Sequence, residues 1–217
     1  MHRFLWDMHY APVPGLKPEY PIAAVYRNTA PDFTSPWVMP GKYTVVLSVN
    51  GKSYTQPLVV EMDPRVKTSM RDLATQLKLS KQLYDRWLDF NAAGDQIKAL
   101  RSQLTDLRSK AKTDDLKTHI DALVAKLDVV AGVEGGRPDP AAKSTIQSAT
   151  AKLRTLFSVL QDVDAAPTPS VIVAVATLQT DAQVLITQWQ AIRSRDLPAL
   201  NQELRAAGLP PVNLEIR

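Results

Sequence analysis

The side chains that most often carry enzyme chemistry are few in this sequence and lie far apart. There are no cysteines, which excludes disulfides, thiolate metal sites and cysteine nucleophiles. The three histidines, His2, His9 and His119, include no pair at the spacing of metal ligands on a helix. A nucleophile elbow, a Walker loop and a G-x-G-x-x-G motif are also missing from the sequence. We therefore predict no catalytic residue, no metal site and no cofactor.

Weaker candidates each have a structural interpretation that we prefer. Asp7 follows Trp6, a neighbourhood that suits a glycosidase carboxylate, but no second carboxylate pairs with it in the pattern. His119 is expected at a helix surface or boundary. Gly135 and Gly136, beside Arg137, are expected to form a loop between helices rather than a cradle for an anion.

Aromatic side chains are the better candidates for binding, because 9 of the 14 aromatic residues fall within residues 1–65. Trp37 lies in a proline-rich connection with Tyr20, Tyr26 and Phe33, and this group could stack against a sugar ring. The alternative is that these rings pack in a core or between domains, which is the commoner use of aromatic residues in small β-sandwiches.

A β-hairpin is the clearest element of residues 1–65. Apolar and polar residues alternate over 43–49 and 52–60, and Asn50-Gly51 between them suits a two-residue type I′ turn. Pro57 is expected where its missing N–H faces no partner. A further strand is predicted over residues 3–10 and a short one over residues 22–26.

These strands are too few for a complete fold. An immunoglobulin-like sandwich has about seven strands, and only three or four can be counted here. We therefore expect a partial immunoglobulin-like antiparallel β-sandwich over residues 1–65, incomplete at its N-terminus. Its first strand would leave an unpaired edge and an open face formed by Phe4, Trp6 and Met8.

Residues 66–217 show the period of helices instead. A proline-free run begins near Thr68, so the first helix is expected to approach 40 residues. Thr113 is the expected N-cap of a second helix, and two more helices and a short last one, about residues 197–207, follow. We predict an α+β protein in which a mostly antiparallel four-helix bundle with one long first helix follows the partial sandwich.

Charge and hydropathy exclude several partners. Lysine and arginine total 26 against 22 acidic residues, and the basic residues of the helical part alternate with acids without interleaved aromatic residues. No nucleic-acid partner is therefore predicted. We find no apolar run of about 18 residues, so no membrane span is predicted. The first residues do not resemble a signal peptide, which would make a complete protein cytoplasmic.

Three segments carry a resemblance to a known family. They are residues 2–10 (HRFLWDMHY), residues 40–65 around the hairpin, and the tail at residues 196–211. Together they resemble the C-terminal region of large bacterial BNR-repeat, sortilin-like β-propeller proteins, which are often labelled glycosyl hydrolases. The similarity covers nearly the whole chain, but no Ser-x-Asp-x-Gly-x-Thr-Trp propeller repeat occurs in it. No functional residue of that family therefore maps onto this sequence.

The resemblance implies an extracytoplasmic setting, with a propeller and the remaining strands of the sandwich preceding this region. Our leading hypothesis is a non-catalytic accessory or interaction module that docks a propeller or another protein through its sheet edge and bundle. Phe4, Trp6, Met8 and Trp37 are the candidate interaction residues. Two alternatives are a carbohydrate-binding part of a glycosidase that uses Trp37, and an independent helical adaptor that associates with itself.

Overall fold

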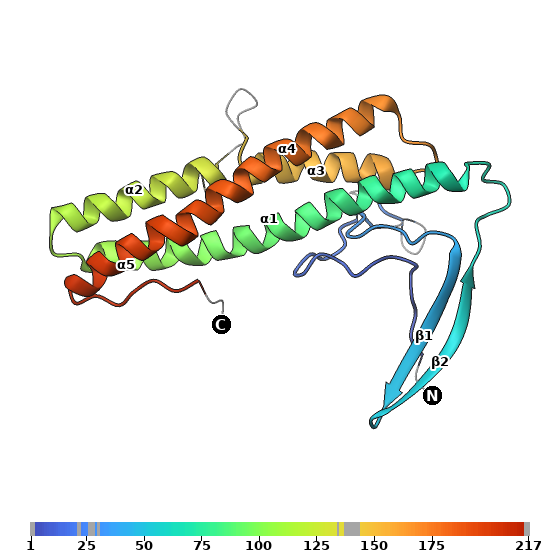
Figure 1. Cartoon of the computed structure of the whole chain (residues 1–217), viewed down its shortest axis with the longest axis horizontal. Helices are drawn as coiled ribbons and strands as arrows, with labels where there is room; N and C mark the ends of the chain where they lie inside the picture. Colours follow the sequence, from blue (N-terminus) through green and yellow to red (C-terminus); the bar gives the residue numbers. More distant parts are fainter. Residues whose placement is uncertain are drawn as a thin grey trace. The chain divides into compact units, whose positions relative to one another are not determined.

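The computed structural model describes residues 3–20, 23–25, 29, 31–133, 135–136 and 144–214. Within this part of the chain the fold is α+β, with helices and a two-stranded antiparallel sheet (Figure 1). The elements, in chain order, are β1 (Gly41–Val49), β2 (Lys52–Val60), α1 (Met70–Lys110), α2 (Asp114–Ala131), α3 (Ile146–Gln161), α4 (Pro169–Ala191), the π-helical turn η1 (Ile192–Asp196) and α5 (Leu197–Ala206).

These elements group into two compact units. The first unit comprises Met1–Tyr84 and Phe157–Ile172, and the second comprises Asp85–Leu156 and Val173–Arg217. The long helix α1 contributes to both. The division near residue 65 that composition suggests stays a prediction, and each compact unit is described by itself below.

The predicted hairpin is the sheet of the first unit. β1 and β2 pair antiparallel from Gly41 opposite Val60 to Val49 opposite Lys52. Asn50 and Gly51 both have positive φ, 49° and 75°, which is the backbone of a type I′ turn. The turn and the alternation of the strands are therefore confirmed.

The other expected strands are not found. Residues 3–10 form a single isolated bridge, His9 to Trp37, because Met8 adopts a left-handed φ of 63° that breaks the extended backbone. Residues 23–25 form no strand, while Ile22 and Tyr26 lie outside the described residues. Two strands among the described residues do not support the partial immunoglobulin-like sandwich.

Helix α1 begins at Met70, two residues after the expected start, and runs for 41 residues. Ser69 explains this start, because its hydroxyl accepts a hydrogen bond from the Asp72 amide at 3.1 Å and donates to the Asp72 carboxylate at 2.7 Å. Thr113 is the N-cap of α2, as predicted, and accepts a hydrogen bond from the Leu116 amide.

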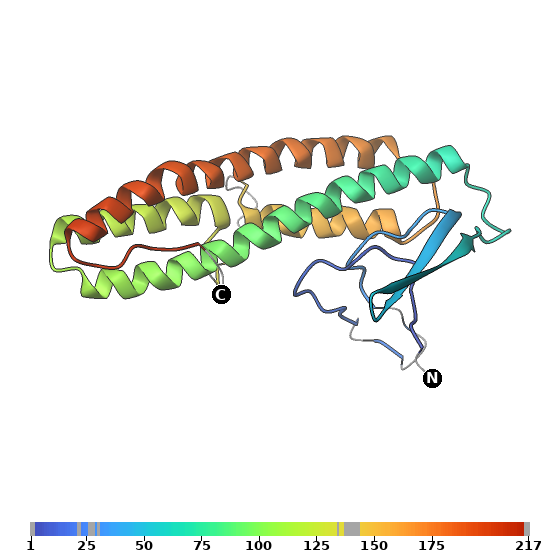
Figure 2. The same ribbon diagram turned by 60° about the horizontal axis from the view of Figure 1, so that its bottom comes forward.

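The second unit is a set of helices (Figure 2). Buried apolar residues along these helices hold them together. Ion pairs show how they run: Arg101 with Asp128 and Arg108 with Asp121 join α1 to α2, so residue numbers rise along one helix as they fall along the other. Two further pairs, His119 with Glu203 and Lys126 with Asp196, join α2 to α5 and η1, and again residue numbers rise along one element as they fall along the other. These neighbours are therefore antiparallel, as expected.

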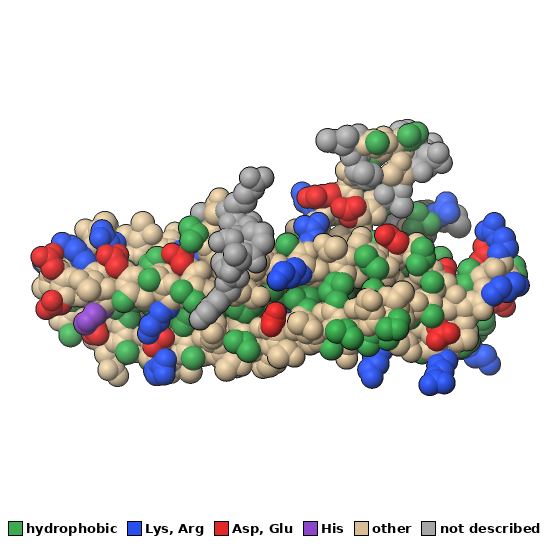
Figure 3. All heavy atoms as spheres, turned by 90° about the horizontal axis from the view of Figure 1, so that it is seen from above, with side chains coloured by type: hydrophobic (Ala, Val, Ile, Leu, Met, Phe, Trp, Pro, Cys, Tyr) green, Lys and Arg blue, Asp and Glu red, His purple; other side chains and the backbone are tan. Residues whose placement is uncertain are grey.

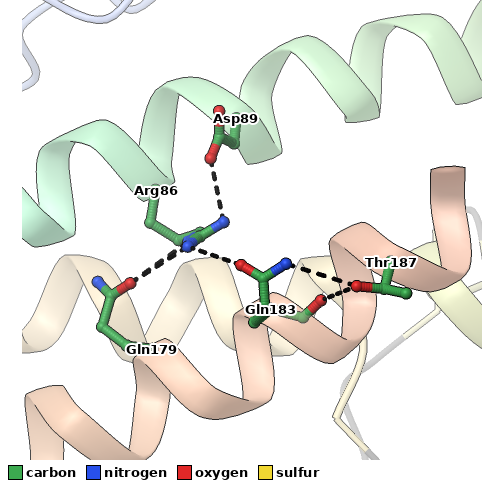
Figure 4. Close-up of polar contacts among 5 residues, drawn as sticks. All are labelled: Arg86, Asp89, Gln179, Gln183 and Thr187. Atoms are coloured by element: carbon green, nitrogen blue, oxygen red, sulfur yellow. Dashed lines mark hydrogen bonds and ion pairs between the residues drawn. The ribbon is translucent and has the colours of Figure 1, made fainter.

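A cluster of polar side chains links α1 to α4 within this unit (Figure 4). The Arg86 guanidinium donates to the side-chain oxygens of Gln179 and Gln183, each at 3.4 Å, and forms an ion pair with Asp89 at 3.1 Å. Gln183 in turn contacts the Thr187 hydroxyl at 3.5 Å. Because each of these groups has a partner within the bundle, we interpret the cluster as a structural link that fixes the register of α1 against α4.

Helices α4 and α5 are continuous through the π-helical turn η1, which sequence periodicity did not predict. Pro198 has no N–H and its ring would crowd the carbonyl four residues earlier in an α-helix. The wider π turn at Ile192–Asp196 accommodates this proline without ending the helix. The helix ends at Ala206, and Gly208 just beyond it has a φ of 73°, which fits the stop that the sequence predicts.

By length and composition alone, the continuous helix Pro169–Ala206 could cross a membrane, and 22% of its most apolar window is buried. A core helix of a soluble protein meets the same criterion, so the prediction of no membrane span stays a prediction. Along the helices, acidic and basic side chains are interspersed on the face seen in Figure 3. This face is therefore not a surface of a single sign, and the prediction of no nucleic-acid partner stays a prediction.

Candidate interaction site

The hairpin has one apolar face that is exposed over most of its length within the described part of its unit. Residues directly opposite one another in an antiparallel pair point to the same side, so the register in the structure defines this face. Its members, called the apolar face below, are Tyr43, Val45, Leu47, Val49, Lys52, Tyr54, Gln56 and Leu58.

Exposure of the apolar face is high where a core would be expected. Val45 is 50% exposed, Leu47 59% and Tyr54 58%. Two-stranded hairpins are marginally stable in water unless a third strand or a helix covers them. A further strand, a helix or a partner that packed on this face would therefore stabilise the hairpin. Leu47 and Tyr54, two of its largest side chains, lie side by side because they are directly opposite in the ladder.

Tyr43, near the start of β1, is the best-anchored member of the apolar face. Its ring packs edge to face against Trp6, with centroids 5.7 Å apart, and its hydroxyl donates a 2.6 Å hydrogen bond to the Met39 carbonyl. Burial, with a smaller contribution from Tyr10, raises the pKa of Tyr43 above its ordinary value of 10.0. The hydroxyl therefore stays protonated and able to donate at physiological pH.

A second feature, the Trp37 cluster, lies beside the start of the hairpin. The ring of Trp37 stacks on His9 with centroids 3.6 Å apart and meets Phe33 edge to face at 6.4 Å. Backbone bonds from Tyr10 to Pro36 and from Val38 to Met8, both 2.9 Å, hold the two segments together. These contacts fix one side of the Trp37 ring, while the residue remains 40% exposed.

Gln161, at the end of α3, anchors the loop that carries Trp37. Its buried side chain accepts a hydrogen bond from the Trp37 amide at 2.8 Å and donates to the Ser80 hydroxyl in α1 at 2.8 Å. Gln76 of α1 adds bonds to the carbonyls of Leu160 and Val163. Two helices therefore position Trp37, although 124 residues separate it from Gln161.

A hollow of about 350 Å³ opens next to Trp37. Its walls include Met8, Phe33 and Val60, and Val60 continues the apolar face because it is opposite Gly41. The carboxylate-bearing residues among its lining are Glu61, Asp162 and Asp164. The apolar face and the hollow thus form one surface that is apolar along the hairpin and acidic at its end.

The predicted interaction residues divide between these features. Met8 and Trp37 line the hollow together, and Trp6 covers the Tyr43 end of the apolar face. Phe4 is 88% exposed and lines neither the hollow nor the face. Sequence alternation had placed Tyr43, Val45, Leu47 and Val49 on one side of β1, but it could not show that this side is exposed.

In the described part of the chain, two histidines lie beside carboxylates: His9 beside Asp7 and His119 beside Glu203. Among the described residues, no group of three or more histidines, aspartates and glutamates could hold a metal ion. His119 forms a surface ion pair with Glu203 at 2.6 Å, and the Asp7 carboxylate accepts a hydrogen bond from the His9 amide. His2 lies outside the described residues.

The chain matches no protein-family model, and searches of curated proteins and of solved structures find no match. The surface itself and the resemblance seen in the sequence are therefore the two indications of function.

Proposed function

We propose that this chain is a non-catalytic interaction module of an extracytoplasmic bacterial β-propeller protein, and that β-structure of that protein docks on the hairpin. The single observation that carries the proposal is the exposure of the apolar face on both strands, from Val45 to Tyr54. In this proposal the hairpin supplies two strands of an immunoglobulin-like sandwich whose other strands belong to the partner.

The size of the surface indicates what kind of contact this would be. Each strand has nine residues at about 3.3 Å each and is therefore about 30 Å long. Two strands spaced about 4.8 Å apart give the face an area of roughly 300 Å². A stable protein interface buries about 800 Å² on each partner, so the apolar face alone is too small. The partner must also contact the hollow at Trp37 or a hairpin edge.

Charge supports the same type of partner. The hollow is lined by the carboxylates of Glu61, Asp162 and Asp164 next to an exposed tryptophan ring. A lysine or arginine of the partner that entered the hollow would meet opposite charge and an aromatic ring together. The partner surface that we propose is therefore an apolar strand or sheet with a basic side chain at one end.

The test measures binding between this chain and a bacterial BNR-repeat β-propeller protein of the kind that the sequence resembles, by isothermal titration calorimetry. Val45→Ser removes apolar surface from the apolar face, and Val46→Ser makes the same change on the opposite face of the same strand. Val45→Ser is expected to weaken binding by roughly tenfold, the equivalent of burying most of a valine side chain. Val46→Ser is expected to change it by less than about twofold. No binding of the unaltered chain, or equal loss in both variants, would contradict the proposal.

A glycan is the second candidate, because the exposed Trp37 and neighbouring carboxylates in the hollow are the pair of groups that sugar sites use. A glycan array probed with this chain tests it. A signal that Trp37→Ala abolishes supports sugar binding, and a blank array removes this candidate.

A further inference from the structure

The two outer edges of the hairpin differ in what they offer to a third strand. Pro57 has no N–H, so its pair with Thr44 must be one that exchanges no hydrogen bonds across the ladder. Hydrogen-bonded and non-hydrogen-bonded pairs alternate in an antiparallel ladder. The pairs Val46 with Thr55 and Ser48 with Ser53 are therefore also of the non-hydrogen-bonded kind.

The serine pair agrees with this assignment. Side chains approach more closely in non-hydrogen-bonded pairs, and the hydroxyls of Ser48 and Ser53 are 2.9 Å apart. The backbone N–H and C=O groups of such residues point away from the partner strand, toward the outer edges of the hairpin. The outward residues of β1 are Lys42, Thr44, Val46 and Ser48, and those of β2 are Ser53, Thr55, Pro57 and Val59.

The edge of β1 is thus an uninterrupted row of four donors and four acceptors. None of these backbone groups has a backbone hydrogen bond outside the hairpin in the described part of the chain. The edge of β2 lacks the donor of Pro57 in its middle, where the ring also obstructs an approaching strand. Only β1 can therefore carry a full third strand.

A third strand on β1 would also add area to the apolar face, which is too small by itself for a stable interface. Alternate residues of an added strand would continue that face beside Val45 and Leu47, so apolar side chains at every second position of the strand would extend it. Edge pairing adds backbone hydrogen bonds to an apolar contact that by itself is too small for a stable interface.

We infer that β1, and not β2, is the edge to which the partner protein adds an extended strand with apolar residues at alternate positions. This inference rests on the proposed function and goes beyond it by assigning the edge. The occupant is a strand of the β-propeller protein; a second copy of this chain is an outcome of the test.

Proline substitutions at the two edges separate the alternatives. Val46→Pro removes an outward N–H of β1 that makes no bond in the free hairpin, and Thr55→Pro makes the matched change directly across the ladder on β2. With the same BNR-repeat β-propeller protein as the probe, Val46→Pro is expected to weaken binding by about tenfold or more, and Thr55→Pro by less than about threefold. Pro57→Thr, which restores a donor on β2, is expected to leave affinity unchanged.

Amide hydrogen exchange supplies a second measurement. On binding, the amides of Thr44, Val46 and Ser48 are expected to become protected, while that of Thr55 is not. In the free Val46→Pro variant, retained protection of the inward amides of Val45 and Leu47 shows that the hairpin still forms.

The binding and exchange measurements distinguish the edge assignment from the proposed docking on the apolar face. If the unaltered chain binds and Val45→Ser weakens it while Val46→Pro does not, the apolar face is the docking site but the edge assignment is wrong. Protection of Thr55 in place of Val46 overturns the assignment as well. Failure of the unaltered chain to bind overturns both. A dimer of the chain alone that Val46→Pro dissociates would show that the strand comes from a second copy, against the proposed partner.

Discussion

Replacing Gln161 with leucine is expected to lower the free energy of unfolding and to release the loop that carries Trp37. Leucine is similar in size but leaves two groups without their partner: the Trp37 amide and the fully buried Ser80 hydroxyl, each now 2.8 Å from the glutamine. An unpaired buried polar group costs about 1–3 kcal/mol, and the added apolar burial returns about 1 kcal/mol. Because two such groups lose their partner, the expected net loss is about 1–5 kcal/mol.

Urea titration followed by circular dichroism and tryptophan fluorescence measures this loss. Gln190→Leu, at an exposed position of α4, is the control and is expected to change the free energy of unfolding by less than about 0.5 kcal/mol. Adding Ser80→Ala to Gln161→Leu removes one of the unpaired groups, so the double variant is expected to be about 1 kcal/mol more stable than the sum of the single changes. A loss below about 0.5 kcal/mol for Gln161→Leu would refute the reasoning that this amide bridges loop and helix.

Three further changes test the second unit. Gly132→Ala places a Cβ atom 2.8 Å from the Gln147 side-chain oxygen at a φ of +92°, so thermal unfolding is expected to show a loss of about 1–2 kcal/mol; an unchanged melting temperature would contradict this. The Arg108 guanidinium lowers the pKa of Asp121 below its ordinary 3.8, so the stability that the pair adds is present above that pH and lost as pH falls through the lowered pKa. Arg108→Ala is therefore expected to reduce stability in urea at pH 7 but not at pH 2, and equal losses at both would argue against the pair. Phe90→Ala, at a side chain 2% exposed, is expected to cost about 3–5 kcal/mol by calorimetry, whereas a loss under about 1 kcal/mol would show that the site is not core.

Helices and turns were predictable because their determinants are local. The Asn50-Gly51 turn needs positive φ at both residues, and Thr113 caps a helix through a bond to an amide three residues on. Local chemistry of this kind can be read from a few neighbouring residues.

The failed strand at residues 3–10 shows the limit of the same reasoning. Its alternation is that of a strand, but strands need a neighbour, and the neighbour available to His9 is a single residue, Trp37, in a proline-rich segment. Likewise, the hydrogen bonds from Gln161 to Trp37 and Ser80 join residues 81 or more positions apart, and no periodicity predicts such a meeting.

The sequence by itself determined the helix stripes, the hairpin and the absence of cysteine chemistry. Tertiary structure alone decided that the apolar side of the hairpin is exposed and that Val60 joins it to the hollow at Trp37. The physical reason is that alternation specifies two sides of a strand but not what covers them. Coverage depends on which distant segments, or which partner, come to lie against each side.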